Sequence, residues 1–233
     1  MAVLNPARKK RASKTPSASI DTYVEVLLER IVDGKRILNF PKGENIFAQG
    51  EYSDAIFFVQ SGRVKISVVS TGGKEAVLAM LGPHGFFGEG ALVGQSVRIS
   101  SASTLEATTV FRVEKTVMIR ALRDQTELSE KFLAALLMRN IEIEEDLCDQ
   151  LFNHSEKRLA RVLMKLARLR DHDEMPNARL TALSHETLAE MVGTTRSRIT
   201  HFMNKFRKLG LIDYGSNGLT VKMELLTDLV LHE

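Results

Sequence analysis

The chain has 233 residues, of which 44% are hydrophobic, and a formal net charge of +3. Its composition has none of the features of a collagen, a disordered chain or a disulfide scaffold. The one cysteine, Cys148, excludes an internal disulfide and a multi-cysteine metal site. No apolar run approaches the roughly 20 residues that span a bilayer, and residues 1–19 lack the apolar stretch of a secretory signal. We therefore expect a cytoplasmic protein with no membrane partner, no metal and no required cofactor.

The charge is distributed unevenly along the chain. Residues 1–19 contain five basic side chains and no acidic ones, which predicts a disordered basic arm. Residues 20–153 carry a net charge of −5, whereas residues 154–233 carry +3. A basic C-terminal part suits a polyanion such as DNA. So small a surplus is, however, also what an ordinary solvated surface carries.

Residues 20–127 are expected to form a β domain that follows a short helix. Apolar residues recur at helical spacing over residues 20–31, which predicts an amphipathic helix. Short apolar segments then alternate with glycine-bearing turns, a pattern typical of an antiparallel sandwich or barrel. The predicted strands are residues 37–40, 46–47, 56–59, 64–69, 76–81, 100–107 and 109–113.

Residues 128–153 are predicted to form one long helix. Leu136, Asn140, Ile143 and Leu147 follow one another at steps of four and three, which is the spacing of a coiled-coil seam. The chain contains no other helix of matching length, so we expect the helix to pair with its copy in a homodimer. The alternative is that the helix packs on its own β domain. Cys148 on this helix is expected to be a buried free thiol, with cross-linking or oxidation as the alternative.

Residues 154–233 are predicted to form a DNA-binding domain of the winged helix-turn-helix type. A helix is expected over residues 154–170 and a polar connector over residues 171–178. Ser184 can cap the next helix, Gly193 supplies a tight turn, Thr194 or Thr195 caps a second helix, and Gly210 ends it. Residues 211–214 and 219–222, joined by a glycine-bearing turn, are expected to form a two-stranded wing. Two such helices also occur in structural αα-hairpins, but the basic outward face and the wing favour DNA.

The second of these helices carries the candidate DNA-reading residues. The guanidinium group of Arg196 can engage O6 and N7 of guanine with two hydrogen bonds. Short polar side chains beside it can touch base edges or phosphates, and the longer basic ones suit phosphates. The predicted DNA-binding residues are Thr195, Arg196, Ser197, Arg198, Thr200, His201 and Lys205. The predicted fold class is thus α+β, with an antiparallel β-roll, a long dimerisation helix and a winged helix.

Over about residues 20–221, and most specifically over residues 188–200, the sequence resembles the CRP/FNR family of bacterial transcription regulators. The resemblance implies a homodimer on a near-palindromic operator, with RNA polymerase as a further partner and Arg196 as the main guanine reader. Many cAMP-responsive members have an acid at the position of Ser197 and an arginine at that of His201. The operator is therefore expected to differ from theirs. Whether the outcome is activation or repression stays open.

The β domain resembles the family's cyclic-nucleotide cassette at residues 87–92, followed by Arg98. The resemblance implies that Glu89 accepts the ribose 2′-hydroxyl group and that Arg98 pairs with the cyclic phosphate. Ile99 replaces a small residue, and Ile143 with Glu144 stands where cAMP-specific members have a Thr-Ser pair. The candidate effector-binding residues are Gly88, Glu89, Gly90, Ala91, Arg98, Ile99, Asn140, Ile143 and Glu144.

Three possibilities follow for this domain. It binds a cyclic nucleotide such as cAMP, cGMP or another, it binds a different small effector, or it retains a Glu89–Arg98 salt bridge without any ligand. A rival function is that of a cyclic-nucleotide-binding regulatory subunit of an enzyme, which would lack the winged helix. No Ser/His/Asp, Cys/His or paired-carboxylate arrangement stands at a catalytic spacing, so we do not expect an enzyme.

Overall fold

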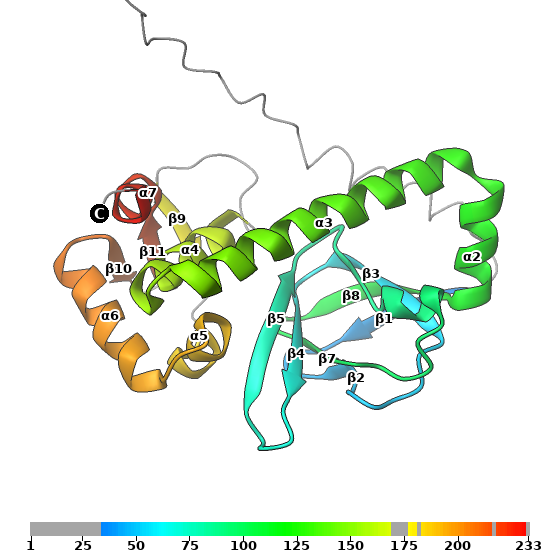
Figure 1. The fold of residues 1–233 in the computed structure, drawn as a ribbon, viewed down its shortest axis with the longest axis horizontal. Helices are drawn as coiled ribbons and strands as arrows, with labels where there is room; N and C mark the ends of the chain where they lie inside the picture. The colour runs from blue at the N-terminus through cyan, green and yellow to red at the C-terminus, as the bar shows by residue number, and fades with distance from the viewer. Residues whose placement is uncertain (1–33, 169–176, 181–182, 216–217, 232–233) are drawn as a thin grey trace, which may run out of the picture.

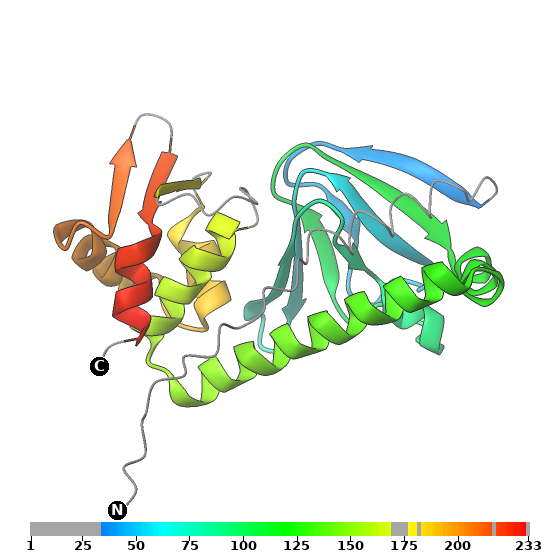
Figure 2. The ribbon, with the colours of Figure 1, turned by 90° about the horizontal axis from the view of Figure 1, so that it is seen from above.

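The computed structural model describes residues 34–168, 177–180, 183–215 and 218–231 (Figure 1). The predicted basic arm, the helix over residues 20–31 and most of the connector over residues 171–178 lie outside the described residues. The described chain folds into an N-terminal β-roll and a C-terminal helical domain, which are linked by one long helix (Figures 1 and 2). No helix of the described part is long and apolar enough to cross a membrane.

The β-roll consists of two four-stranded antiparallel sheets. One sheet has the order β1-β8-β3-β6 and the other the order β2-β7-β4-β5. The strands are β1 (Lys35–Phe40), β2 (Asn45–Phe47), β3 (Ala55–Ser61), β4 (Val64–Val69), β5 (Glu75–Leu81), β6 (Phe86–Phe87), β7 (Ser101–Thr104) and β8 (Thr108–Glu114). All seven predicted strands are present, and the two-residue strand β6 is additional. The predicted span 100–107 is shortened to β7 because the chain turns towards β8 after Thr104.

Strand β3 shows how the β-roll divides its apolar side chains between two cores. Successive side chains of a strand point to opposite faces. Phe57 and Val59 accordingly lie between the sheets with Phe87, while Ile56 and Phe58 lie on the outer face. Every residue from Ala55 to Val59 is buried, because the outer face of this sheet is covered by helices.

Those covering helices are α2 (Lys115–Asp124) and α3 (Thr126–Phe152). The first turns of α3 bury Leu128, Phe132 and Ala135 in the outer core of the β-roll, so α3 is packed on its own domain there. Beyond that point α3 extends from the β-roll to the C-terminal domain (Figure 2). It starts two residues before the predicted helix. Cys148, expected to be a buried thiol, is exposed on it.

The C-terminal domain contains four helices and a three-stranded sheet among the described residues. They are α4 (Ser155–Arg168), β9 (Asn177–Leu180), α5 (His185–Val192), α6 (Arg196–Lys208), β10 (Ile212–Gly215), β11 (Gly218–Lys222) and α7 (Met223–Leu231). The strands have the order β10-β11-β9. The prediction of a two-stranded wing was therefore incomplete, since β9 pairs with β11 and buries Ala178 and Leu180 in the domain core.

Candidate nucleic-acid interface and effector site

The helix-turn-helix is defined by two capped helices. The Ser184 hydroxyl group accepts a hydrogen bond from the backbone N–H of Thr187 at 3.0 Å at the start of α5. Gly193 ends α5 with a φ of 67°, a left-handed conformation that glycine adopts at little cost. Thr195 then caps α6 by accepting from the N–H of Arg198 at 3.4 Å. Of the two predicted cap residues, Thr195 is thus the one that acts.

Helix α6 is apolar on one face and polar on the other. Ile199, Phe202, Met203 and Phe206 are buried against the domain core. Arg196, Ser197, Arg198 and His201 are exposed, whereas Thr200 is half-buried because it faces α5. The first turn of α6 therefore presents its polar groups to solvent, as the predicted reader helix requires.

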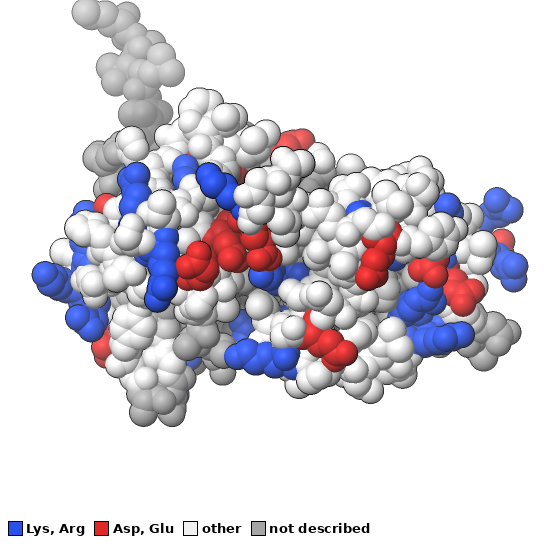
Figure 3. Space-filling view, turned by 90° about the horizontal axis from the view of Figure 1, so that it is seen from below, with Lys and Arg blue, Asp and Glu red and all other residues white. Residues whose placement is uncertain are grey.

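The predicted DNA-binding residues differ in the partners they already have. The guanidinium carbon of Arg198 lies 5.8 Å from the ring centroid of Phe202, and Lys205 forms an ion pair with Glu156 of α4 at 2.7 Å. The guanidinium group of Arg196 has no hydrogen bond or ion pair with the described residues. Figure 3 shows Lys and Arg side chains gathered on the end of the molecule that the C-terminal domain forms, with acidic side chains between them and the β-roll. Among these residues Arg196 is the most readily available for a new partner.

The cassette of the β-roll is built on a short 3-10 helix. This element, η1 (Glu89–Val93), lies between Gly88 and Gly94, which have φ values of 80° and 91°. A Cβ atom at Gly88 would lie 2.6 Å from Nη1 of Arg98. Glycine is therefore needed at position 88 both for the backbone conformation and for the close approach of the arginine.

Arg98 is buried beneath the cassette, its side chain only 4% exposed. Its Nη1 donates to the carbonyl oxygen of Gly88 at 3.1 Å and its Nη2 to that of Ala55 at 2.7 Å. The guanidinium carbon lies 4.4 Å from the ring centroid of Phe47. Burial lowers the pKa of Arg98, although Asp54 opposes that shift. The Nε atom is buried and has no hydrogen-bond partner, which leaves a donor available for an anion.

Glu89 forms an ion pair with Arg139, which is not one of the predicted effector-binding residues. Its carboxylate lies 3.1 Å from Nη1 of Arg139 on α3, and the same Nη1 donates to the carbonyl oxygen of Phe86 at 2.9 Å. The Glu89–Arg98 salt bridge, one of the three possibilities for this domain, is not among the ion pairs of the described chain, because each residue has another partner. The signal for Arg139 was its helical register. It stands four residues after the buried Ala135, so it continues the face of α3 that covers the β-roll.

The other candidate effector residues do not join the cassette within one chain. The Asn140 side-chain amide donates to the Glu144 carboxylate at 2.7 Å on the exposed face of α3. Ile143 is 55% exposed and Ile99 is 62% exposed. The structure gathers five of the candidate residues around η1: Gly88, Glu89, Gly90, Ala91 and Arg98. The Glu89 carboxylate, which was expected to bind a ligand, forms an ion pair with Arg139.

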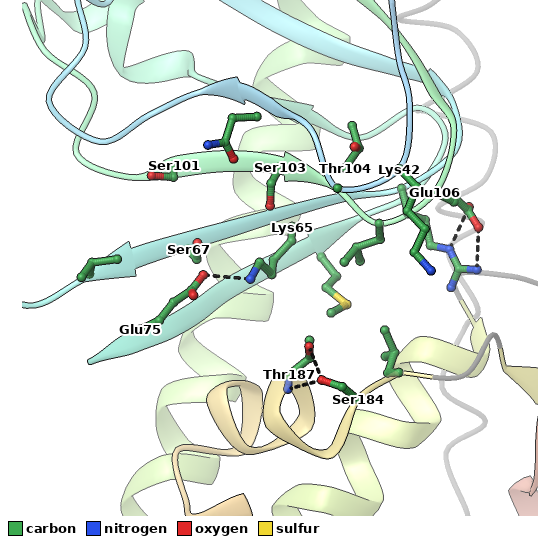
Figure 4. A pocket seen from close by; sticks show the side chains of 17 residues that line it. Lys42, Lys65, Ser67, Glu75, Ser101, Ser103, Thr104, Glu106, Ser184 and Thr187 are labelled. Carbon is green, nitrogen blue, oxygen red and sulfur yellow. Dashed lines mark hydrogen bonds and ion pairs between the residues drawn. The ribbon is translucent and has the colours of Figure 1, made fainter. Parts of the chain in front are cut away.

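A polar cavity of about 630 Å³ lies between the β-roll and the helix-turn-helix (Figure 4). Figure 4 shows side chains of the β-roll on one side of it and Ser184 and Thr187 of the other domain opposite them. At its margin the Lys65 ammonium group lies 2.8 Å from Glu75 and 3.7 Å from Glu190 of α5. Burial raises the pKa of Glu190, and Lys65 opposes that shift. This contact could not be predicted, because no local pattern of residues links a strand of one domain with a helix of another.

The segment between α3 and α4 is held by hydrogen bonds from arginine. Nη1 of Arg158 donates to the carbonyl oxygen of Asn153, and Nε donates to that of Val192, both at 3.1 Å. Arg161 of α4 forms an ion pair with Asp149 of α3. The end of the long helix is thus connected directly to the turn of the helix-turn-helix.

A β-roll with a glycine-bounded cassette, joined by a long helix to a winged helix, is the architecture of a transcription regulator of the CRP type. Residues 37–125 match the family model of the cyclic nucleotide-binding domain, and residues 157–229 match that of the Crp-like helix-turn-helix domain. The chain belongs to the CRP/FNR family of transcription regulators. The predictions of family, fold class and DNA-binding type are confirmed.

Three known proteins illustrate the similarity. The chain is 30% identical to the CRP-like cAMP-activated global transcriptional regulator of Mycobacterium tuberculosis, over 75% of this chain and 79% of the relative. It is 31% identical to the cyclic AMP receptor protein of Thermus thermophilus, over 81% and 85%. The structure of CLP, the c-di-GMP-responsive global regulator of Xanthomonas campestris, has a TM-score of 0.70 at 19% identity, over 84% and 98%. The curated relatives are transcription regulators and not enzymes.

Proposed function

We propose that the chain acts as a homodimer that binds a near-palindromic operator and is gated by a cyclic nucleotide in its β-roll. The observation that carries this proposal is the exposed polar first turn of α6 above a complete apolar core. In a helix-turn-helix the start of the second helix enters the major groove. The Arg196 side chain has no partner to give up among the described residues and would read guanine. Ser197 and His201 would lie beside it, and Thr195 and Arg198 would contact phosphates.

The exposed apolar stripe of α3 supports the dimer. Large apolar side chains that are 48–66% exposed follow the helix on the side away from the β-roll: Leu133, Leu137, Ile141, Ile143, Leu147 and Leu151. A contiguous stripe of this kind marks an interaction surface. Its occupant would be a second copy of α3, since Leu133, Leu137, Asn140, Glu144, Leu147 and Leu151 follow one another at coiled-coil spacing. The polar Asn140–Glu144 pair in the middle would fix the register.

A cyclic nucleotide is the effector that the cassette supports best. The buried, unpartnered Nε of Arg98 is a donor that a phosphate could satisfy, and the glycine at position 88 keeps the backbone close to that arginine. Two relatives are named for their response to cAMP. The ligand would displace Arg139 from Glu89 and so act on α3, the helix that reaches the DNA-binding domain. Binding would shift the population between two dimer states.

A second candidate is a regulator that needs no effector. It is favoured by the fact that Glu89 and Arg98 already have partners within the chain. Calorimetry of the full chain against cAMP, cGMP and c-di-GMP separates the two candidates. Binding of one ligand that is lost in Arg98→Ala and kept in Arg36→Ala supports gating. The absence of heat with all three ligands, while specific DNA binding persists, supports the second candidate.

The DNA-binding role is tested by selecting operator sequences from random duplexes with the native dimer. Arg196→Ala is expected to weaken binding to the selected site by about 1–3 kcal/mol per half-site. Lys208→Ala, on the last turn of the same helix, is the matched control and should weaken all duplexes alike. Unchanged affinity of Arg196→Ala for its operator would remove Arg196 as a reader. RNA polymerase as a partner, and the cytoplasm as the location, stay predictions.

A further inference from the structure

The hydroxyl group of Thr200 already has two hydrogen bonds within the protein. Its oxygen lies 3.0 Å from the carbonyl oxygen of Arg196, one turn earlier on α6. A carbonyl oxygen can only accept, so the bond to Arg196 requires the single hydroxyl proton of Thr200. Nδ1 of His185 lies 2.9 Å from the same hydroxyl oxygen. In the Nδ1–H tautomer the imidazole donates to the hydroxyl oxygen, and in the other tautomer the hydroxyl group donates to Nδ1; the contact with His185 is made in both cases.

These two bonds fix the orientation of the Thr200 side chain. A β-branched residue in a helix has few allowed χ1 rotamers, and exchanging the hydroxyl and methyl positions would break both bonds at once. His185 belongs to the first turn of α5, so the bond also joins the two helices of the helix-turn-helix. The methyl group takes no part in these bonds, and its orientation is set by them.

The position of Thr200 on α6 places this methyl group among the candidate base readers. It stands one turn after Arg196, and residues four apart lie on the same side of a helix. Ser197 and His201, which lie next to this line on the side away from the buried face of α6, are exposed. A methyl group cannot hydrogen-bond, but it can contact the 5-methyl group of thymine, which projects into the major groove.

We propose that Thr200 recognises thymine through its methyl group, and that His185 is a positioning residue that holds this methyl group in place. The inference rests on the proposed DNA-reading role of α6. Recognition by the hydroxyl group is the competing possibility, since the oxygen retains one lone pair that could accept from an amino group of adenine or cytosine.

The test uses the native dimer and its selected operator, with each thymine in turn replaced by deoxyuridine, which lacks only the 5-methyl group. One symmetry-related thymine should respond, with binding about fourfold weaker per half-site, the effect of one buried carbon group. Thr200→Val keeps the methyl group and loses the hydroxyl group, so it should keep this sensitivity. Thr200→Ser keeps the hydroxyl group and loses the methyl group, so it should lose the sensitivity to deoxyuridine. Lys208→Ala, on the last turn of α6, is the control and should keep the sensitivity to deoxyuridine.

The positioning role of His185 is tested by a double substitution. His185→Ala alone should reduce the sensitivity to deoxyuridine, because Thr200 can then turn its methyl group away. In Thr200→Val, which has a methyl group at both positions, adding His185→Ala should change nothing. A purely structural role of His185 would instead reduce the sensitivity in both backgrounds. Thermal unfolding of each variant checks that the domain is folded.

Specific DNA binding without any sensitive thymine would overturn the inference and leave the proposed function intact. Sensitivity that persists in Thr200→Ser, or that is lost in Thr200→Val, would show that the Thr200 methyl group is not what contacts thymine and would also overturn the inference. Failure of the native dimer to select any operator would instead contradict the proposed function itself.

Discussion

Two neighbouring residues of α3 are expected to have opposite effects on folding and on association. Phe132 is 4% exposed, and its ring centroid lies 5.0 Å from that of Phe86 and 6.5 Å from that of Phe58. Leu133, the next residue, is 56% exposed and belongs to the stripe proposed for the dimer. The two alanine variants therefore separate the two faces of one helix.

Phe132→Ala removes a ring from a closely packed core. Such a change costs about 3–5 kcal/mol in the free energy of unfolding, through lost burial and the cavity that remains. Leu133→Ala should cost the isolated subunit less than about 0.5 kcal/mol. In a dimer, covering the exposed half of the leucine would contribute about 1 kcal/mol per chain. Loss of both copies would weaken association by about 2 kcal/mol, or roughly 30-fold.

Urea unfolding followed by circular dichroism, at several protein concentrations, measures the free energy of unfolding. Sedimentation equilibrium measures the dissociation constant of the dimer. The effect of Phe132→Ala should be independent of concentration, whereas that of Leu133→Ala should appear only where dimers are populated. If both variants lost the same free energy of unfolding at concentrations where the chain is monomeric, the assignment of Phe132 to the core and of Leu133 to the dimer surface would be refuted. An unchanged dissociation constant of the dimer in Leu133→Ala would refute this assignment too.

Three further expectations follow from the structure. Gly88→Ala should abolish effector heat in calorimetry and cost about 1–3 kcal/mol in urea unfolding, because the left-handed backbone is strained and the Cβ atom would meet Arg98. The pKa of Glu190 is raised in the folded state, so between its ordinary value of 4.5 and its folded value the folded state binds more protons than the unfolded state. The free energy of unfolding should therefore fall as the pH rises through this range. Glu190→Gln should remove this slope in urea titrations and Glu186→Gln should keep it. Ser184→Ala should lower the free energy of unfolding of the C-terminal domain by about 1 kcal/mol, measured by calorimetric melting, whereas Ser197→Ala should lower it by far less.

The sequence was most informative where structure depends on local chemistry. Glycine turns separated the strands of the β-roll, and the caps at Ser184 and Thr195 located the helix-turn-helix, because both depend on a few adjacent residues. Strand β9 was missed because its four residues gain stability only by pairing with β11, which is distant in the sequence.

The periodicity of α3 was read as one apolar stripe, although the helix has two. Of the predicted seam, Leu136 belongs to the face that packs on the β-roll, while Leu147 belongs to the exposed one. Spacing alone cannot assign apolar residues to two different partners on neighbouring faces. The contacts of Arg139 and Lys65 were missed for a related reason, since each depends on how one element is placed against another.

The course of α3 also determines where the molecule can be divided. A fragment that ends at residue 125 would leave Phe58, Phe86 and Phe111 without the helix that covers them. Limited proteolysis of the native protein should therefore cut near Asn153 rather than before Thr126. The smallest independently folding N-terminal fragment would then carry the complete helix. A ligand-binding module isolated from this protein would bring its association surface with it.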